Sequence, residues 1–428
     1  MDYMPKFDSL AELAAHQLAG LKWTVSHVYN NNEFYKRRFA EAGVKPGQIK
    51  TLDDLRRLPF TTAQDLAEEY PFPFLSVPME KVVRLHASSG TTGKRKVMTY
   101  TRKDINDWAH MFARCYQMAG LTALDRVQIA VGYGVWTAGV GFQLGCEEFG
   151  ALAVPVGPGA VDMQCQFLED FQSTVLGCTA SMGLLLSEEI RKRGLSERLA
   201  LKKIIYGSER SSEAMRQKIS EGLSGAELFD IPGLTELYGP GTGLECRQHQ
   251  GMHYWADYYI LEIINPDTLE PARPGEMGEM VVTSLCKEAS PLLRYRTRDL
   301  SRLLPTPCAC GNMLPRHDRL LGRSDDSIKY RAVNIYPGQL DEVLSRESGV
   351  DSEYQVVLER RSDGREYMVI KVERRENADL NQDEALVARL SKAIKAKMLV
   401  SAEVEVQDFA SLPRSERKTR RVFDRRFD

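Results

Sequence analysis

Short β-prone segments alternate with helix-like stretches through the first half of this chain, and this alternation limits the folds open to it. The β-prone segments read "VVRLHA", "VQIAVGY", "ALAVPV", "STVLGCT" and "KKIIYG", at residues 82–87, 127–133, 151–156, 173–179 and 202–207. Strands that alternate with helices usually form a largely parallel sheet covered by helices. The pattern therefore predicts an α/β domain.

Different patterns flank this region. Residues 8–70 show apolar side chains at three- and four-residue spacing, which predicts helices. From Tyr254 the β-prone runs follow one another closely, which indicates a β-rich subdomain. After residues 322–337 the order helix, strand, strand, helix, strand predicts a compact α+β unit that runs to the C-terminus.

Composition narrows the class of protein. A chain of 428 residues suits two or three domains, and its formal net charge of -2 argues against a nucleic-acid binder. The N-terminus lacks the basic and apolar regions of a signal peptide. Residues 127–146 are uncharged, but five glycines favour a buried strand, a turn and a packed helix over a membrane span. We therefore expect a cytoplasmic protein with no membrane partner.

Eight cysteines are scattered along the chain, and in a reducing compartment most should be buried thiols. Cys308 and Cys310 differ, because they lie one residue apart in a loop flanked by proline and glycine. Two thiols so placed suggest a metal site.

The segment 87–101, "ASSGTTGKRKVMTYT", is dense in small and hydroxylated residues ahead of Lys94. Such a loop lets backbone N–H groups converge on an anion, with lysine adding charge. It is not a Walker A loop, because only two residues separate Gly90 from Gly93 and Arg95 follows the lysine. A surface turn without a ligand is the alternative interpretation.

"SSGTTGK" resembles the phosphate loop of the adenylate-forming enzymes, the acyl- and aryl-CoA synthetases. Further segments resemble other motifs of that family in the same order: "DIPGLTELYGPGTGLEC", "LLRYRTRDL", "GRSDDSIKYRAVNIYP" and "LPRSERKTRRV". Within the family, "GMHYWADYYILEIINP" and "SLCKEASPLLRYRTRDL" are similar to the phenylacetate–CoA ligase branch. The resemblance spans the chain from about residue 20 to its end.

This resemblance implies a large N-terminal ATP- and acid-binding domain at residues 1–323, with parallel sheets, flanking helices and a β-rich subdomain. A small mobile α+β lid would follow at 324–428, with its hinge at Asp325. The implied nucleotide contacts are Ser88, Ser89, Gly90, Thr91, Thr92, Gly93 and Lys94 for the phosphates, Ser208 and Glu209 for adenine, Asp230 and Ile231 beside them, Asp299 for the ribose hydroxyls and Arg323 for a phosphate.

The same resemblance implies the catalytic set. Thr235 and Glu236 would meet the nucleotide and its Mg²⁺, a hard cation that prefers carboxylate oxygen. Lys418 would stabilise the charge that develops between the acid and the α-phosphate. Taken alone, Glu236 would be a loop glutamate, Asp299 a partner of Arg296 and Arg298, and Lys418 one residue of a basic tail.

The implied reaction has two steps. A carboxylate attacks the α-phosphorus of MgATP to give an acyl-adenylate and pyrophosphate, and the thiol of CoA then displaces AMP. Tyr133 and Trp136 match the segment of the acid pocket, although core packing would explain them equally well. Aryl or arylacetic acids are the first expectation, and a homodimer is the expected assembly.

For the metal site, the ligand set would be Cys246, His253, Cys308 and Cys310 around a structural Zn²⁺. His249 competes with His253 as the fourth ligand. Four protein ligands leave no open coordination position, so the metal would stabilise the fold.

Four positions depart from the family pattern. Arg95 replaces a proline, Pro232 an aromatic residue near adenine, and Arg417 a glycine before Lys418. Ala332 stands where the family has glycine beside the pantetheine tunnel, so CoA transfer would be slowed or another acceptor used. A carrier protein or amine as acceptor, or a catalytically degenerate nucleotide-binding relative, therefore stay open as alternatives.

Overall fold

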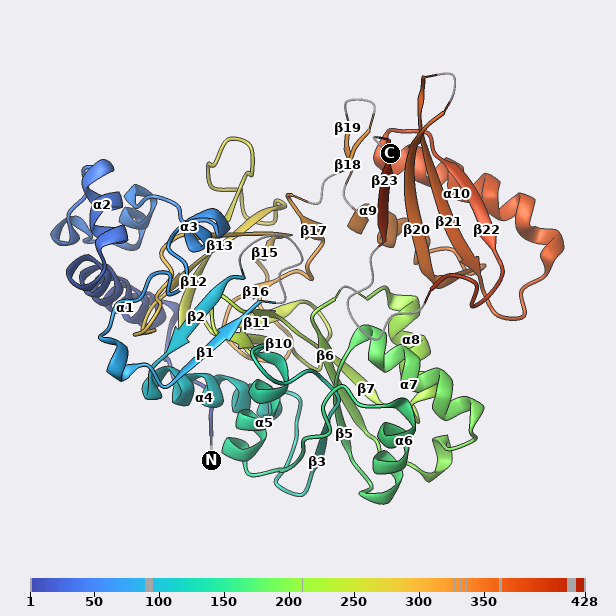
Figure 1. Cartoon of the computed structure of the whole chain (residues 1–428), viewed down its shortest axis with the longest axis horizontal. Coiled ribbons are helices and arrows are strands. Elements are labelled where there is room, and N and C mark those ends of the chain that lie inside the picture. Colours follow the sequence, from blue (N-terminus) through green and yellow to red (C-terminus); the bar gives the residue numbers. More distant parts are fainter. Residues whose placement is uncertain are drawn as a thin grey trace. The chain divides into compact units, whose positions relative to one another are not determined.

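The computed structural model describes residues 2–88, 95–209, 211–325, 328–330, 333–335, 337–361, 364–413 and 421–426. The chain divides into two units (Figure 1). The first contains Met1–Cys178, Leu199–Ser208 and Glu227–Arg319, and the second contains Thr179–Arg198, Glu209–Ala226 and Leu320–Asp428.

A five-stranded sheet forms the centre of the first unit, with strands in the order β4-β3-β5-β6-β7. Its strands are β3 (Arg126–Ile129), β4 (Leu152–Val154), β5 (Val175–Thr179), β6 (Lys203–Gly207) and β7 (Glu227–Ile231). β3 pairs in parallel with β4 and with β5, and β6 pairs in parallel with β7. Every residue of β5 is buried, as expected for a strand that is covered on both faces. The predicted α/β domain with a parallel sheet is confirmed.

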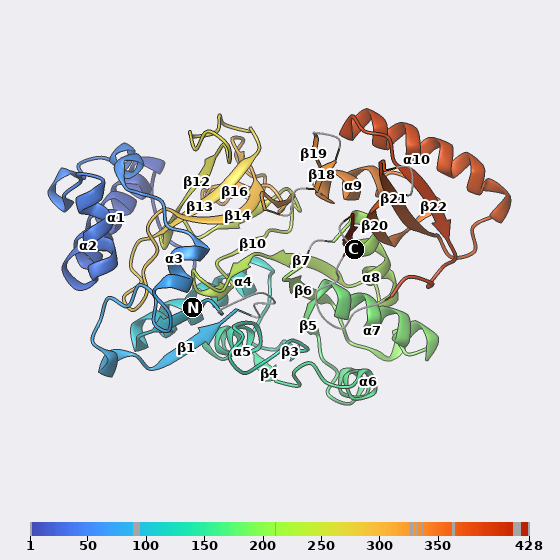
Figure 2. The ribbon, with the colours of Figure 1, turned by 45° about the horizontal axis from the view of Figure 1, so that its top comes forward.

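Glycines let two helices pack closely beside this sheet. α4 (Arg102–Met118) contacts α5 (Ala138–Phe149), and α5 runs beside β3 and β4 (Figure 2). A Cβ atom added to Gly145 would lie only 2.5 Å from the Cβ of Phe112 on α4, so the close approach requires glycine there. The uncharged segment 127–146 is thus a strand, a turn and a packed helix, as predicted. Among the described helices, none is long and apolar enough to cross a membrane.

Helices precede the sheet and antiparallel strands follow it, again as the sequence predicts. The N-terminal helices are α1 (Leu10–Asn31), α2 (Glu33–Glu41) and α3 (Ala63–Glu68). A hairpin pairs β1 (Arg84–Ala87) with β2 (Val97–Tyr100), and a smaller one pairs β8 (Gly233–Leu234) with β9 (Gly239–Pro240). In the β-rich part, β13 (Gly278–Ser284) pairs with β12 (Tyr259–Ile264) on one side and β14 (Tyr295–Ser301) on the other. A second sheet has the order β10 (Gly243–Glu245), β11 (Met252–Tyr254), β16 (Arg316–His317) and β15 (Leu303–Leu304). The remaining helix of this unit is α6 (Val161–Asp170).

The second unit contains α7 (Ala180–Lys192), α8 (Glu213–Gly222) and the C-terminal α+β segment. The elements of that segment are β17 (Gly322–Arg323), β18 (Ile328–Tyr330), β19 (Val333–Ile335), α9 (Pro337–Leu344), β20 (Val350–Arg360), β21 (Glu366–Arg374), α10 (Asp383–Met398), β22 (Glu403–Gln407) and β23 (Val422–Arg425). Its four-stranded sheet has the order β22-β21-β20-β23, and α10 lies along the sheet (Figure 1). The predicted elements are all present, and β23 is an additional strand.

The C-terminal segment has a hydrophobic core of its own. Leu340 of α9 and Leu390 and Ile394 of α10 are fully buried with Val356 and Ile370 of the sheet. Each side chain recurs at the spacing that its element requires, four residues apart on α10 and alternating along β20 and β21. All the buried residues of this cluster come from positions 330–400.

Candidate active site

Five of the predicted site residues of the first unit lie at the ends of the parallel strands or in the segments that follow them. Tyr133 and Trp136 follow β3, Ser208 follows β6, and Asp230 and Ile231 end β7. β3 lies between β4 and β5, so the chain direction across the sheet reverses at this strand. In open α/β sheets ligands bind outside the carboxyl ends of the strands at such a point. The topology therefore places these residues where a ligand site is expected.

β6 and β7 approach each other closely at their carboxyl ends. A Cβ atom on Gly207 would lie 2.4 Å from the carbonyl oxygen of Ile231, so only glycine fits there. The next residue, Ser208, has a φ of 74°, in the left-handed region that few non-glycine residues adopt. Backbone strain of this kind is typical of residues held in place for a function.

In the second unit, Glu209 contacts the beginning of α7. Its carboxylate accepts hydrogen bonds from the Ser181 N–H at 3.0 Å and from the Ser181 hydroxyl at 2.6 Å. A carboxylate in the first turn of a helix is stabilised by the unpaired N–H groups there. Glu209 therefore has a structural role that the sequence did not reveal.

Glu236 lies in the loop between β8 and β9, and its side chain is only 4% exposed. Its Oε1 atom accepts a hydrogen bond from Lys96 Nζ at 2.6 Å and one from the Tyr295 hydroxyl at 2.8 Å. A buried carboxylate needs partners of this kind to stay ionised. Neither Lys96 nor Tyr295 was predicted from the sequence as a site residue.

The backbone of the Glu236 loop is held by two buried side chains. Lys287 is fully buried, and its Nζ donates to the carbonyl oxygens of Leu237 at 2.5 Å and Glu236 at 3.3 Å. The Tyr100 hydroxyl donates to the carbonyl oxygen of Tyr238 at 2.9 Å. The Lys287 ammonium also lies 4.6 Å from the ring centroid of Tyr100 and 5.0 Å from that of Tyr238. Burial lowers the pKa of Lys287 to about 7, against the opposing effect of nearby carboxylates.

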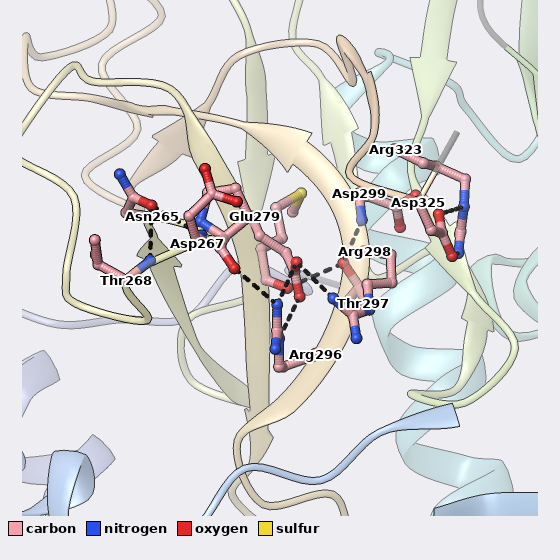
Figure 3. Close-up of polar contacts among 12 residues, drawn as sticks. Asn265, Asp267, Thr268, Glu279, Arg296, Thr297, Arg298, Asp299, Arg323 and Asp325 are labelled. Carbon is pink, nitrogen blue, oxygen red and sulfur yellow. Dashed lines mark hydrogen bonds and ion pairs between the residues drawn. The ribbon is translucent and has the colours of Figure 1, made fainter. Parts of the chain in front are cut away.

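β14 carries Asp299, whose N–H donates to the Thr297 hydroxyl at 3.0 Å (Figure 3). The neighbouring arginines pair with another acid. Arg296 donates to both carboxylate oxygens of Glu279, at 2.8 and 2.9 Å, and Arg298 approaches Glu279 at 3.4 Å (Figure 3). Glu279 therefore takes the role of arginine partner that was the alternative for Asp299.

In the second unit, Arg323 and Asp325 contact each other. The guanidinium donates through Nε and Nη2 to the two carboxylate oxygens, at 2.8 and 2.9 Å (Figure 3). The proposed phosphate contact and the proposed hinge residue are thus one bidentate ion pair.

The segment after β3 is tied to the hairpin that leads into the phosphate loop. The Val135 carbonyl oxygen accepts from the Ala87 N–H at 2.8 Å and lies 3.1 Å from His86 Nδ1. His86 is 2% exposed, and burial lowers its pKa to about 4. Trp136 is half-buried, and its ring lies against Gly132. Burial raises the pKa of Tyr133 to about 12, and its hydroxyl has no hydrogen-bond partner among the described residues.

Ser88 closes the base of the phosphate loop. Its N–H donates to the Lys96 carbonyl oxygen at 3.0 Å, and its hydroxyl accepts from the Lys96 N–H at 3.3 Å. Ser89, Gly90, Thr91, Thr92, Gly93, Lys94, Ala332 and Lys418 lie outside the described residues.

The predicted metal ligands come together in the β-rich part. Ligand atoms of Cys246, His253, Cys308 and Cys310 all lie within 4.8 Å of one another. Cys246 Sγ lies 3.5 Å from Cys308 Sγ, and Cys310 Sγ lies 3.3 Å from His253 Nε2. His249 is not in this cluster, because its ring faces Glu227 and Glu245, each at 3.4 Å. Of the two histidines, His253 is the one beside the thiols.

Comparisons with known proteins identify the family of this chain. Residues 27–286 match the family model of the AMP-binding enzymes, and residues 332–426 match that of their C-terminal domain. The chain is 41% identical to the phenylacetate-coenzyme A ligase of Escherichia coli, over 98% of this chain and 96% of the relative. It is 40% identical to the ligase of the same name from Thermus thermophilus, over the full length of both.

A solved structure of 2-hydroxyisobutyryl-CoA ligase with 2-HIB-AMP superimposes with a TM-score of 0.89 at 26% identity, over 100% of this chain and 95% of that one. Sequence and fold agree over almost the whole length. The chain belongs to the AMP-binding enzymes, in their phenylacetate–CoA ligase branch.

Proposed function

We propose that this protein is an AMP-forming acid–thiol ligase that activates an aryl or arylacetic acid as its adenylate and transfers the acyl group to CoA. The observation behind this proposal is the roughly 40% identity, over almost the whole chain, to proteins named phenylacetate–CoA ligases. ATP and CoA are then the cosubstrates.

In the first half-reaction the protein has to bind ATP and orient the acid. Ser88 through Lys94 hold the phosphates, Ser208, Glu209, Asp230 and Ile231 surround the base, and Asp299 accepts from the ribose hydroxyls. Mg²⁺ would neutralise phosphate charge beside Thr235 and Glu236, and the Oε2 atom of Glu236 has no partner among the described residues. Carboxylate oxygen is the donor that this cation prefers, so the residue fits the metal. Lys418 stabilises charge at the reacting carboxylate and α-phosphate.

Tyr133 and Trp136 line the acid pocket in this proposal. A buried tyrosine hydroxyl with no hydrogen-bond partner among the described residues suits an aromatic acid that has a polar end. In the second half-reaction the unit after Asp325 reorients to admit the thiol, a hinge motion. The division into 1–323 and 324–428, the homodimer and the cytoplasmic location stay predictions of the sequence.

One assay tests the ligase proposal. Aryl, arylacetic and aliphatic acids are supplied with MgATP, with and without CoA, and pyrophosphate and the CoA ester are measured separately. Arylacetic acids should give both products, and Glu236→Gln and Asp299→Asn should lose at least tenfold in kcat/KM, as expected when a charged contact to the substrate is removed. Release of pyrophosphate without formation of a CoA ester would show that the acyl group goes to an acceptor other than CoA. No acid-dependent pyrophosphate would contradict the enzyme assignment.

We further propose that Cys246, His253, Cys308 and Cys310 hold one structural Zn²⁺. Zinc–sulfur bonds of about 2.3 Å in a tetrahedral site place sulfur atoms somewhat under 4 Å apart, and the 3.5 Å between Cys246 and Cys308 fits. His253 Nδ1 lies 2.8 Å from the Leu314 carbonyl oxygen, so it donates there and leaves Nε2 for the metal. All four ligands come from protein, which suits a structural site.

A further inference from the structure

Glu236 is held by two partners of different kinds. Both contact the same oxygen, Oε1, and Tyr295 is a buried neutral donor whereas Lys96 brings a positive charge. The Lys96 side chain is 28% exposed, while that of Glu236 is 4% exposed. Among the described residues, the cation within ion-pair distance of this buried carboxylate is the Lys96 ammonium, which reaches in from the solvent side, while the buried Lys287 ammonium acts on it from farther away.

Lys96 is fixed at its backbone, and its long side chain is partly exposed. Its N–H and carbonyl oxygen are both paired with Ser88, which fixes the place where the side chain begins. Among the described residues, Glu236 is the only acid within ion-pair distance of its ammonium. Four rotatable bonds let the ammonium leave Oε1 without a change in the backbone.

Two cations cannot share this carboxylate at low cost. A divalent metal and an ammonium on the same carboxylate group repel each other, more strongly where the group is shielded from water. A metal therefore binds Glu236 more tightly if the ammonium withdraws. Because the Lys96 side chain is partly exposed, its ammonium can move toward solvent.

We propose that Lys96 is the resting counter-ion of Glu236, which it holds in position until the metal–nucleotide complex takes its place. This role rests on the proposed function, in which Glu236 meets Mg²⁺. It makes Lys96 a positioning residue that competes with the metal. Tyr295, which is uncharged, keeps its hydrogen bond to the carboxylate throughout.

The test measures metal affinity directly, with Mn²⁺ as a paramagnetic substitute for Mg²⁺. The free Mn²⁺ signal is titrated against protein with and without a non-hydrolysable ATP analogue. Lys96→Gln keeps a hydrogen-bond donor but removes the charge, so it should bind Mn²⁺ more tightly than the wild type, on the order of tenfold. A residue that served only the fold would lose affinity when altered, not gain it.

Three further variants complete the design. Lys96→Met removes charge and donor together, and circular dichroism reports whether it folds; if it does not, Lys96→Gln alone decides. Tyr295→Phe removes the other partner of Oε1 without changing charge, and its Mn²⁺ affinity should change about threefold or less. In a Glu236→Gln background, Lys96→Gln should not change the Mn²⁺ affinity further, because residue 236 no longer carries the charge that Lys96 pairs with.

The outcomes separate this proposal from the one on which it rests. If the wild type binds Mn²⁺ with the nucleotide analogue but Lys96→Gln binds it equally or more weakly, the counter-ion role is wrong and the ligase function stands. If Glu236→Gln leaves Mn²⁺ affinity unchanged, Glu236 is not a metal ligand and both proposals about it fall.

Discussion

His86 lies on β1, directly before the phosphate loop, and connects this strand with the segment after β3. Its buried ring is neutral. Its pKa is lowered from 6.5 to about 4, so the unfolded chain binds the proton more readily than the folded one. The stabilising effect is complete above pH 6.5 and is lost as the pH falls toward 4. Through this residue, the wild type should lose about 2 kcal/mol of unfolding free energy between pH 6.5 and pH 4.5. His86→Asn keeps a hydrogen-bond donor but does not titrate, so we expect the variant not to show this loss.

Urea unfolding of both proteins at several pH values measures this difference. The two curves should lie parallel above pH 7 and diverge below pH 6.5. Parallel curves over the whole range would show that His86 does not titrate with folding.

Lys287 is the second residue whose replacement we expect to change the stability of the protein. Lys287→Met leaves the carbonyl oxygens of Glu236 and Leu237 without their donor, so we expect a loss of about 2–3 kcal/mol in unfolding free energy and a raised KM for MgATP. Lys103→Met is the matched control, because it removes the same charge from a side chain that is 45% exposed. Equal losses in the two variants would contradict a special role for Lys287.

The sequence led to Glu236 as a site residue but not to Lys96 and Lys287, the lysines that contact it or its loop. Glu236 and Asp299 stand in recognisable motifs, whereas the Lys96–Glu236 contact joins residues 140 positions apart. Lys287 lies in the segment "SLCKEASPLL", where a single lysine among small and apolar residues was the available signal. Nothing local indicates which acid a lysine will meet, because that is decided by how the sheets pack.

At the scale of elements, periodicity and glycine content predicted most of the fold. Residues 127–146 were correctly assigned to a strand, a turn and a helix, because their five glycines, with Gly132 and Gly134 around Tyr133, break the pattern of a single long helix. β23 was missed, since "VFDR" is short and follows a basic run that suggests only solvent exposure. It forms by pairing in parallel with β20, a contact across more than sixty residues of chain.

The four proposed zinc ligands come from β11, from the residue after β10 and from the loop after β15, so one bound metal would link these segments. We expect about one Zn²⁺ per chain by elemental analysis, and a fall of roughly 5–10 °C in Tm when Cys308→Ser removes a ligand. Cys178→Ser, at a buried cysteine outside the cluster, is the control for loss of a thiol. A metal-free protein whose Tm is unaffected by Cys308→Ser would show that the cluster is only four packed side chains.

At the scale of the whole molecule, the C-terminal segment has a closed core. Because every buried residue of that cluster lies within 330–400, a fragment of residues 320–428 should fold without the rest of the chain. We expect cooperative thermal unfolding by circular dichroism, with a stability of about 5 kcal/mol, the lower end for a domain of this size. Leu390→Asp, at a fully buried position of α10, should abolish the transition. A wild-type fragment without a transition would show that α7 and α8 are needed.

The shared carbonyl of Val135 has a consequence for protein engineering. Since His86 and Ala87 both bond to it, the segment proposed to line the acid pocket is linked to β1, the strand directly before the phosphate loop. Grafting residues 130–137 from a ligase of different specificity should therefore alter the KM for ATP as well as that for the acid. Acid specificity and ATP binding therefore cannot be changed independently by such a graft. A graft that keeps ATP binding would have to include the residues of the other ligase that correspond to His86 and Ala87.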